Sequence, residues 1–210
     1  GSGKTVVSSD VMRSAVRKGS KVLFLAHRIE LIAQTCDKLS AFDLEHNIYA
    51  PEKDITAIRH KQVRKYGKSR VDPFASIAVG TVQTVSRRLD KITEPDLIII
   101  DETHLAIANS YQKICNAFPR ARILGLTATP CRLDGRPLGE MFEKITVLAT
   151  AQEIADMGFL VPFRAFSASE TVNLANIKTT MGDYDKKQLA EEMEKPRLIG
   201  NAVEHYKKLA

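Results

Sequence analysis

The sequence lacks tryptophan, has only three cysteines, and contains no apolar run near the roughly 18 residues that a membrane-spanning helix needs. Cys36, Cys115 and Cys131 lie far apart and form no Cys-x-x-Cys pair, so we expect neither a disulfide framework nor a structural zinc site. Widely spaced thiols are typical of proteins in a reducing compartment. Because no signal-peptide pattern is seen either, these absences predict a cytoplasmic protein with no membrane partner.

Aromatic residues make up only 6% of the chain, which argues against an extracellular carbohydrate-binding or antibody-like surface. Hydrophobic residues at 44% and charged residues at 27% exclude a disordered or fibrous chain. With 210 residues, the chain has room for one large domain, or for one full domain and part of another. Its formal net charge of +6 favours acidic partners such as nucleic acid or an anionic membrane.

Short apolar runs alternate with amphipathic stretches over the first part of the chain. Strand-length runs occupy residues 22–26, 76–79, 97–100 and 122–126, and helical spacing is found at 5–18, 28–39 and 84–89, with a weaker signal at 58–66. Strands without polar alternation, separated by helices, predict a parallel sheet covered on both faces, in an α/β fold with right-handed crossovers. Ligands in such sheets bind beyond the carboxyl ends of the strands.

The pattern changes after Pro130. Residues 150–157 are expected to form a helix ending at Gly158, and residues 161–166 to form a strand. Residues 167–183 are polar and irregular, which is typical of a linker or loop. Helical spacing returns at 186–193 and 198–209, with Pro196 between the two segments.

The chain opens with Gly-Ser-Gly-Lys-Thr, immediately before the first expected helix. Small residues let successive backbone N–H groups close around an anion, and the helix N-terminus adds the positive end of its dipole. Lys4 is placed to reach the β- and γ-phosphates of a nucleotide, and the Thr5 hydroxyl suits a magnesium ligand. This is the latter part of the phosphate-loop pattern; the alternative is an unrelated Gly-Lys-Thr sequence.

Two carboxylates, Asp101 and Glu102, follow directly on the apolar run 97–100. In a phosphate-loop enzyme, magnesium and the attacking water need anions at the end of a buried strand. Asp101 is then expected to hold the metal, and Glu102 to orient and deprotonate the water. A lone Asp-Glu pair could also cap a turn, but Lys4 and Thr5 in the same chain favour the catalytic interpretation.

The segments 101–104 (Asp-Glu-Thr-His) and 126–130 (Leu-Thr-Ala-Thr-Pro) resemble motifs of the superfamily 2 helicases and translocases, the DEAD/DEAH-box relatives. Residues 25–31 look like motif Ia, and residues 79–84 look like the nucleic-acid-contacting segment that precedes motif II. The resemblance covers nearly the whole chain. Similarity to the RadD-like branch, and more loosely to type III restriction translocases, comes from Arg132, Asp134, Gly135 and the segment 157–162.

The resemblance implies ATP and Mg²⁺ as cofactors and gives a role to each matching residue. It implies nucleotide binding by Gly1, Ser2, Gly3, Lys4, Thr5, Asp101, Glu102 and His104, of which Lys4, Asp101 and Glu102 would be catalytic and Thr5 and Asp101 would hold magnesium. It implies nucleic-acid contacts from Arg28, Gly80, Thr81 and Gln83, and coupling of the two sites by His104, Thr127 and Thr129.

Several of these residues have plainer interpretations when taken alone. Arg28 could start a solvated helix, His104 could be an ordinary histidine, and Thr127 and Thr129 could cap a turn. A basic stretch at residues 59–70 could contact phosphates or could be a solvated helix face.

The resemblance also implies a domain organisation. We expect residues 1–160 to form the first RecA-like domain, without its first strand, and residues 161–210 to form a linker and the start of a truncated second RecA-like domain. The second domain normally supplies arginine fingers, whose loss costs about 10³–10⁵ in rate, so this fragment alone is expected to hydrolyse ATP poorly. Thr103 departs from the family pattern, in which smaller residues such as Ala or Cys are usual.

The expected function is therefore that of an ATP-dependent helicase or translocase. DNA is favoured over RNA as its partner, because the most similar branch contains DNA repair and restriction proteins. Two alternatives stay open: a phosphate-loop ATPase that does not act on nucleic acid, and a non-catalytic nucleic-acid-binding module.

Overall fold

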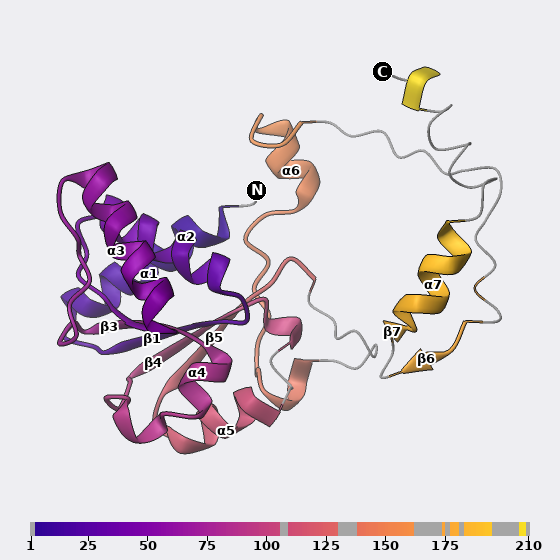
Figure 1. Ribbon diagram of the computed structural model, residues 1–210. Coiled ribbons are helices and arrows are strands. Elements are labelled where there is room, and N and C mark those ends of the chain that lie inside the picture. Colours follow the sequence, from indigo (N-terminus) through magenta and orange to yellow (C-terminus); the bar gives the residue numbers. More distant parts are fainter. Residues whose placement is uncertain are drawn as a thin grey trace. The chain divides into compact units, whose positions relative to one another are not determined.

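The computed structural model describes residues 3–105, 109–129, 138–161, 174, 177–180, 183–194 and 206–208 (Figure 1). The chain divides into two compact units, one made of residues 1–132 and 137–160 and the other of residues 133–136 and 161–210. Gly1 and Ser2 lie outside the described residues, as do Cys131, Arg132, Asp134 and Gly135. No helix in the described ranges has both the length and the apolar character needed to cross a membrane.

A five-stranded parallel sheet organises the first unit. Its strand order is β2-β3-β1-β4-β5, with β1 at Val22–Ala26, β2 at Asn47–Tyr49, β3 at Ile77–Thr81, β4 at Leu97–Asp101 and β5 at Arg122–Leu126. All four pairings are parallel. The α/β prediction is confirmed, and the unalternating apolar sequences have their physical reason: both faces of the sheet are buried.

Helices cover both faces of this sheet (Figure 1). On one face lie α1 (Lys4–Arg17), α2 (Ile29–Ala41) and α3 (Glu52–Tyr66), which pack against Phe24, Val79 and Ile99. The other face is covered by α4 (Val82–Ser86) and α5 (Asn109–Ala117), which pack against Leu23, Ile98 and Ile100. The two hydrophobic clusters hold the strands in register and so fix where each strand ends.

Several element boundaries differ from those expected. The helix expected at 58–66 begins six residues earlier, at Glu52, because Pro51 precedes it in extended conformation and acidic residues favour its first turn. The helix expected at 84–89 is the shorter α4, because the Thr81 hydroxyl caps it and a 3₁₀ turn, Leu89–Lys91, follows. Sequence analysis missed β2 and α5, and it ended β3 two residues too early.

Beyond β5, a 3₁₀ turn lies at Leu138–Glu140 and a short helix, α6, at Ala151–Asp156, where Thr150 and Glu153 form a capping box. The second unit contains a two-stranded antiparallel pairing of β6 (Thr179–Thr180) with β7 (Asp183–Tyr184), within a stretch that we expected to be irregular. Its helix α7, Lys186–Met193, matches the predicted bounds. Residues 162–166 of the strand expected at 161–166, and most of the helix expected at 198–209, lie outside the described residues.

A buried polar network ties α3 to the sheet. Gln62 is 1% exposed and donates through Nε2 to the Cys36 carbonyl at 3.4 Å, with His46 Nε2 3.1 Å away. Its Oε1 accepts from the Ser69 hydroxyl at 2.9 Å and from the Arg70 backbone N–H at 3.0 Å. His46 is fully buried, and its Nδ1 lies 2.9 Å from the Leu44 carbonyl. These contacts suit a neutral imidazole that donates from Nδ1 and accepts at Nε2.

This network makes stability depend on pH in a defined direction. Burial lowers the pKa of His46 below its ordinary value, so the unfolded chain binds a proton that the folded chain resists. The contribution of His46 to the free energy of unfolding is fully present above the pKa of the unfolded chain, about 6.5. It is lost as the pH falls below that value, by at most about 1.4 kcal/mol per pH unit. Urea unfolding across this range measures the effect. His46→Gln should remove this pH-dependent part of the free energy of unfolding, and the exposed control His60→Gln should keep it. Equal slopes of unfolding free energy against pH in the two variants would show that His46 is not its source.

Candidate functional site

The carboxyl ends of the central strands meet at one edge of the sheet. Leu25 of β1 is in register with both Gly80 of β3 and Ile100 of β4, and Asp101 is in register with Leu126 of β5. The residues that follow these strands are therefore held side by side although they are far apart in the sequence. Most of the predicted site residues lie at this edge: Arg28, Gly80, Thr81, Gln83, Asp101, Glu102, His104, Thr127 and Thr129.

The start of α1 has the features of an anion site. Gly3, at the N-cap position, has a φ of 73°, in the left-handed region that favours glycine. Its carbonyl accepts from the N–H groups of Val6 and Val7, so the preceding N–H groups of the first turn have no partner within the helix. No acidic residue occupies that turn. Lys4 and Thr5, both partly buried, are positioned here as predicted.

An ion pair joins α1 to the end of β4. Lys4 Nζ lies 2.6 Å from Glu102 Oε1, and each side chain is 26% exposed. The two residues are 98 positions apart in the sequence, so the contact is a product of the fold. It brings together the predicted phosphate-binding lysine and the predicted catalytic carboxylate.

Asp101 and Glu102 form a close carboxylate pair. The Glu102 backbone N–H donates to Asp101 Oδ1 at 3.0 Å, and Glu102 has a φ of 53°, an uncommon conformation for a residue other than glycine. Burial, and then the neighbouring Glu102 charge, raise the pKa of Asp101, and Lys4 and His27 oppose this shift. A divalent cation would offset the cost of keeping both carboxylates ionised.

These donors fit magnesium better than a metal held by protein alone. The described residues contain no cluster of three or more His, Cys, Asp or Glu side chains that could hold a metal ion. Mg²⁺ keeps several waters and commonly takes one or two protein oxygens together with substrate phosphates. Asp101 and the Thr5 hydroxyl could supply those oxygens beside the predicted phosphate loop.

His104 lies between the carboxylate pair and the end of β5. Its Nδ1 is 3.4 Å from Glu102 Oε2, 3.3 Å from Thr127 Oγ1 and 3.4 Å from Thr129 Oγ1. The Thr127 hydroxyl donates to the Thr129 carbonyl, so it can only accept from His104. This arrangement favours the tautomer with hydrogen on Nδ1. The structure thus brings together all three predicted coupling residues with Glu102.

Thr103 has a role that sequence analysis missed. It is 2% exposed, and its hydroxyl lies 3.1 Å from the carbonyls of both Ile100 and Leu126, bridging the ends of β4 and β5. Glycine is needed opposite it, because a Cβ on Gly125 would lie 2.6 Å from Thr103 Oγ1 and 2.8 Å from Phe142 Cε1. The available sequence signal was the departure of Thr103 from the motif of the family that the sequence resembles.

The predicted nucleic-acid residues fall into two groups. Arg28 at the N-cap of α2 and Gln83 in the first turn of α4 are exposed, so their side chains can reach a ligand. Gly80 and Thr81 are buried in the last two positions of β3. Thr81 uses its hydroxyl to cap α4 through Thr84, and a Cβ on Gly80 would lie 2.6 Å from Val85 Cγ2. These two residues shape the loop and position Gln83.

Two more polar groups at this edge were not predicted. His27 Nδ1 and the Tyr111 hydroxyl are buried without a hydrogen-bond partner among the described residues. Burial, and then the charges of Asp101 and Glu102, raise the pKa of Tyr111 to about 12. Its helical spacing with Ile114 and Phe118 was the available signal for α5.

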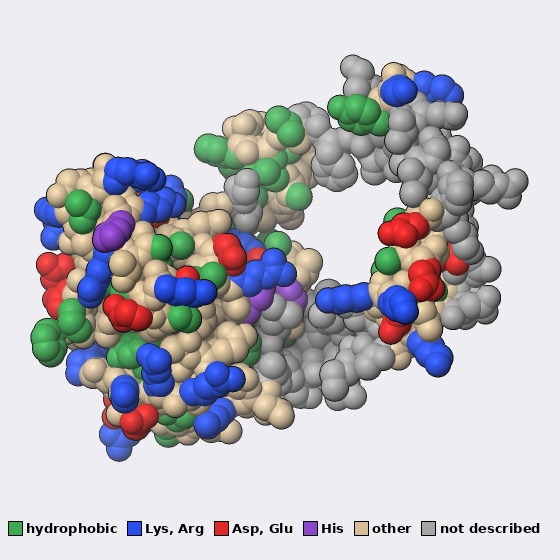
Figure 2. All heavy atoms as spheres, viewed as in Figure 1, with side chains coloured by type: hydrophobic (Ala, Val, Ile, Leu, Met, Phe, Trp, Pro, Cys, Tyr) green, Lys and Arg blue, Asp and Glu red, His purple; other side chains and the backbone are tan. Residues whose placement is uncertain are grey.

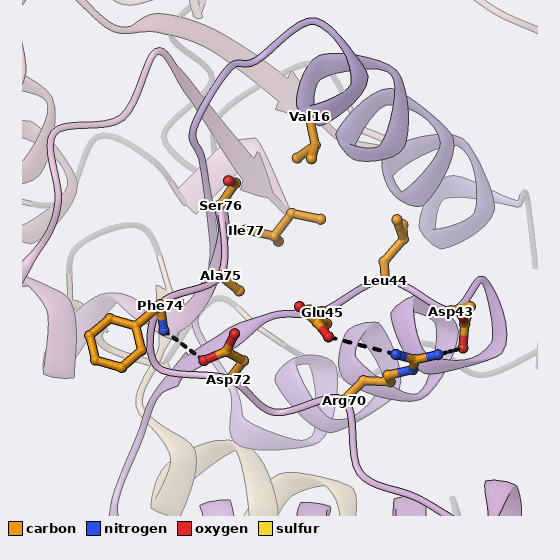
Figure 3. Close-up of a pocket in the computed structure, with 10 residues that line it drawn as sticks. All are labelled: Val16, Asp43, Leu44, Glu45, Arg70, Asp72, Phe74, Ala75, Ser76 and Ile77. Carbon is orange, nitrogen blue, oxygen red and sulfur yellow. Dashed lines mark hydrogen bonds and ion pairs between the residues drawn. The ribbon is translucent and has the colours of Figure 1, made fainter.

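A cavity of about 330 Å³ lies away from this edge (Figure 3). It is lined by Ser76 and Ile77 at the amino end of β3, and by Leu44 and Glu45 before β2. Arg70 forms ion pairs there with Asp43 and Glu45. The residues that line this cavity include none of the predicted site residues.

The bridge made by Thr103 can be tested by removing its hydroxyl. Thr103→Val keeps the shape of the side chain but removes the single O–H donor that the Ile100 and Leu126 carbonyls share, so we expect it to lower the free energy of unfolding by about 1 kcal/mol. Thr103→Ser keeps the hydroxyl and should retain most of the stability. Urea unfolding at neutral pH measures both variants; a Thr103→Val variant as stable as the parent chain would show that the bridge contributes nothing.

Comparison with known proteins gives one family match and several relatives. Residues 1–132 match the family model described as type III restriction enzyme, res subunit. The chain is 28% identical over its whole length to the 51.5 kDa protein of a Lactococcus phage, isolate 7-9. It is 30% identical, over 92% of its length, to the Saccharomyces cerevisiae protein named "Putative ATP-dependent helicase IRC3". It spans only 40% and 28% of these two relatives.

Among solved structures, the crystal structure of the UvsW helicase from bacteriophage T4 is similar to 61% of the chain and is itself covered to 44%. The TM-score is 0.47 and the sequence identity is 18%.

Proposed function

Because the chain belongs to the family of the type III restriction enzyme res subunit, we propose that it is the nucleotide-hydrolysing part of an ATP-dependent helicase or translocase. The observation that carries this proposal is the 2.6 Å contact between Lys4 and Glu102, beside Asp101. The contact sets an ammonium group beside two carboxylates at one edge of the sheet, which supports roles for Lys4 in phosphate binding, for Glu102 as general base and for Asp101 as metal ligand. The yeast relative, with a helicase name, supports the same activity.

The first turn of α1 is proposed to bind the phosphates of ATP. The unpaired N–H groups there and the positive end of the helix dipole favour an anion, and Lys4 adds a full charge. Thr5 and Asp101 would hold Mg²⁺. When bound, the metal neutralises charge that develops on the phosphate oxygens.

Glu102 is the proposed general base. In the ion pair, its carboxylate is held by Lys4; phosphate oxygens would compete for the Lys4 ammonium and leave the carboxylate free to accept a proton. Glu102 would orient a water and take its proton as the water oxygen bonds to the γ-phosphorus and the bond to the ADP oxygen breaks. The second Glu102 oxygen faces His104, so the base is held from two sides.

Nucleic acid is proposed to lie along the carboxyl edge, against Arg28 and Gln83. Side chains of this kind suit sequence-independent contacts to phosphates. His104, Thr127 and Thr129 would link this path to Glu102, because their contacts run from the catalytic carboxylate to the end of β5. We favour DNA over RNA because restriction enzymes act on DNA.

ATP turnover by the full-length gene product is the decisive test. We expect strong stimulation by single-stranded DNA, weaker stimulation by RNA, and loss of turnover in Lys4→Ala at unchanged nucleic-acid binding. Arg28→Gln should weaken the stimulation and leave basal turnover unchanged. Turnover that neither polymer changes would reject the helicase assignment and favour an ATPase that does not act on nucleic acid.

Ligand binding can be tested separately, with the 210-residue chain. ATP with Mg²⁺ at about 100 times the dissociation constant should raise the free energy of unfolding by about 2.7 kcal/mol. Asp101→Asn should lose the part of this gain in unfolding free energy that requires Mg²⁺. Lys4→Ala should lose most of the gain, with or without Mg²⁺. Unfolding curves with ATP alone, with ATP and Mg²⁺, and with EDTA separate the contributions; no gain in the parent chain would contradict the nucleotide site.

A further inference from the structure

The outer face of α3 is the most basic helical surface in the described part of the chain. The helix carries five Lys and Arg residues and only two acidic residues, and both acids lie in its first turn. From residue 57 to its end, every formal charge is positive: Arg59, Lys61, Arg64 and Lys65. Figure 2 shows Lys and Arg side chains gathered over α3. This concentration exceeds what the overall charge of the chain would place on a single helix.

The arrangement of these charges follows from the helix period. At 100° per residue, Lys53, His60 and Arg64 fall on one outward ridge, opposite the buried Ile58 and Gln62. Small exposed side chains lie between them on the same side, so the ridge is open to a ligand. It is about 16 Å long from Lys53 to Arg64, and over that distance one strand of duplex DNA carries about five phosphates.

Local effects account for only part of the charge. The helix dipole favours Arg64 and Lys65 in the last turn, and Lys65 is paired with Asp37 at 2.7 Å. Lys53 and Arg59 lie outside that turn, and no ion pair is found for either within the described residues. Like charges recur at a spacing of four residues, Lys61 with Lys65, which disfavours the helix in the absence of an anion.

The position of α3 connects this ridge to the proposed nucleic-acid path. Tyr49, the last residue of β2, is in register with Gly80 of β3, and α3 starts three residues after Tyr49. The strands β2 and β3 are neighbours in the sheet, and α3 follows β2 as the loop that carries Gln83 follows β3. Lys53 therefore lies at the same edge of the sheet as that loop. The buried Gln62 network holds the helix in place, so the basic ridge is rigidly presented.

We propose that the outer ridge of α3 binds the phosphate backbone of a nucleic-acid strand and extends the path beyond the motif loops. This inference rests on the proposed function, because it needs a nucleic acid at the carboxyl edge. The contacts are to phosphates, so they are independent of sequence and weaken as salt rises.

The test uses a double variant of the 210-residue chain, Lys53→Gln and Arg64→Gln, which removes the two cations of the ridge and keeps helix-forming side chains. A matched control removes two exposed cations from α1 and α2: Arg17→Gln and Lys38→Gln. Affinity for a single-stranded oligothymidylate of about 16 nucleotides is measured between about 50 and 200 mM salt. Thermal unfolding without nucleic acid checks that both variants fold. In α3, the loss of an unfavourable cation near the helix N-terminus offsets the loss of a favourable one near its C-terminus, so the melting temperature should change little.

We expect the α3 variant to bind more weakly and its slope of log affinity against log salt to be shallower by about 1.4, since each of two phosphate contacts on a single strand contributes about 0.7. The control should keep the slope of the parent chain. Equal slopes in the α3 variant and the control, with binding reduced by Arg28→Gln, would overturn the inference and leave the proposed function standing. An absence of binding by the parent chain would overturn both.

Discussion

The parallel pairing of β4 with β1 on one side and β5 on the other is the constraint on which the site depends. It places the ends of three strands at one edge, and α1 brings Lys4 to the same edge across 98 positions of sequence. A slip of one residue in β4 would turn Asp101 to the other face of the sheet and shift Glu102 away from Lys4. The apolar residues Ile98, Ile99 and Ile100, all fully buried, therefore determine the chemistry by fixing this register.

The charged side chains at the carboxyl edge of the sheet favour the binding of a further cation. Lys4 supplies one positive charge beside two carboxylates, and burial together with Glu102 raises the pKa of Asp101. At 26% exposure, the Lys4–Glu102 pair is still screened by water and contributes little net stability. Its effect is on position, because it holds the Glu102 carboxylate at the first turn of α1. The left-handed backbone of Glu102 points to the same conclusion, since such conformations persist where the surrounding structure imposes them.

The sequence predicted the sheet, the family and the edge at which the site lies, because the apolar runs and the motifs are local signals. It did not predict β2, which has only three residues, or the start of α3, where Pro51 and not an apolar period sets the boundary. The Thr103 bridge and the constraint on Gly125 depend on contacts between β4 and β5. Contacts of that kind are set by tertiary packing, and no spacing within one segment encodes them. The burial of Thr81, expected in a loop, has the same origin.

The two proposed nucleic-acid surfaces differ in how they relate to the nucleotide. The contacts from Glu102 through His104 to Thr127 lie next to Lys4, the proposed phosphate-binding residue, so in the proposed mechanism this path would change with the state of the nucleotide. The ridge of α3 is held instead by Gln62 and its buried partners, which have no contact with Lys4 or the carboxylates. A strand bound there would keep its hold while contacts at the catalytic edge change. A motor of the proposed kind must release and regrip nucleic acid without losing it, and the two proposed surfaces would supply both kinds of contact.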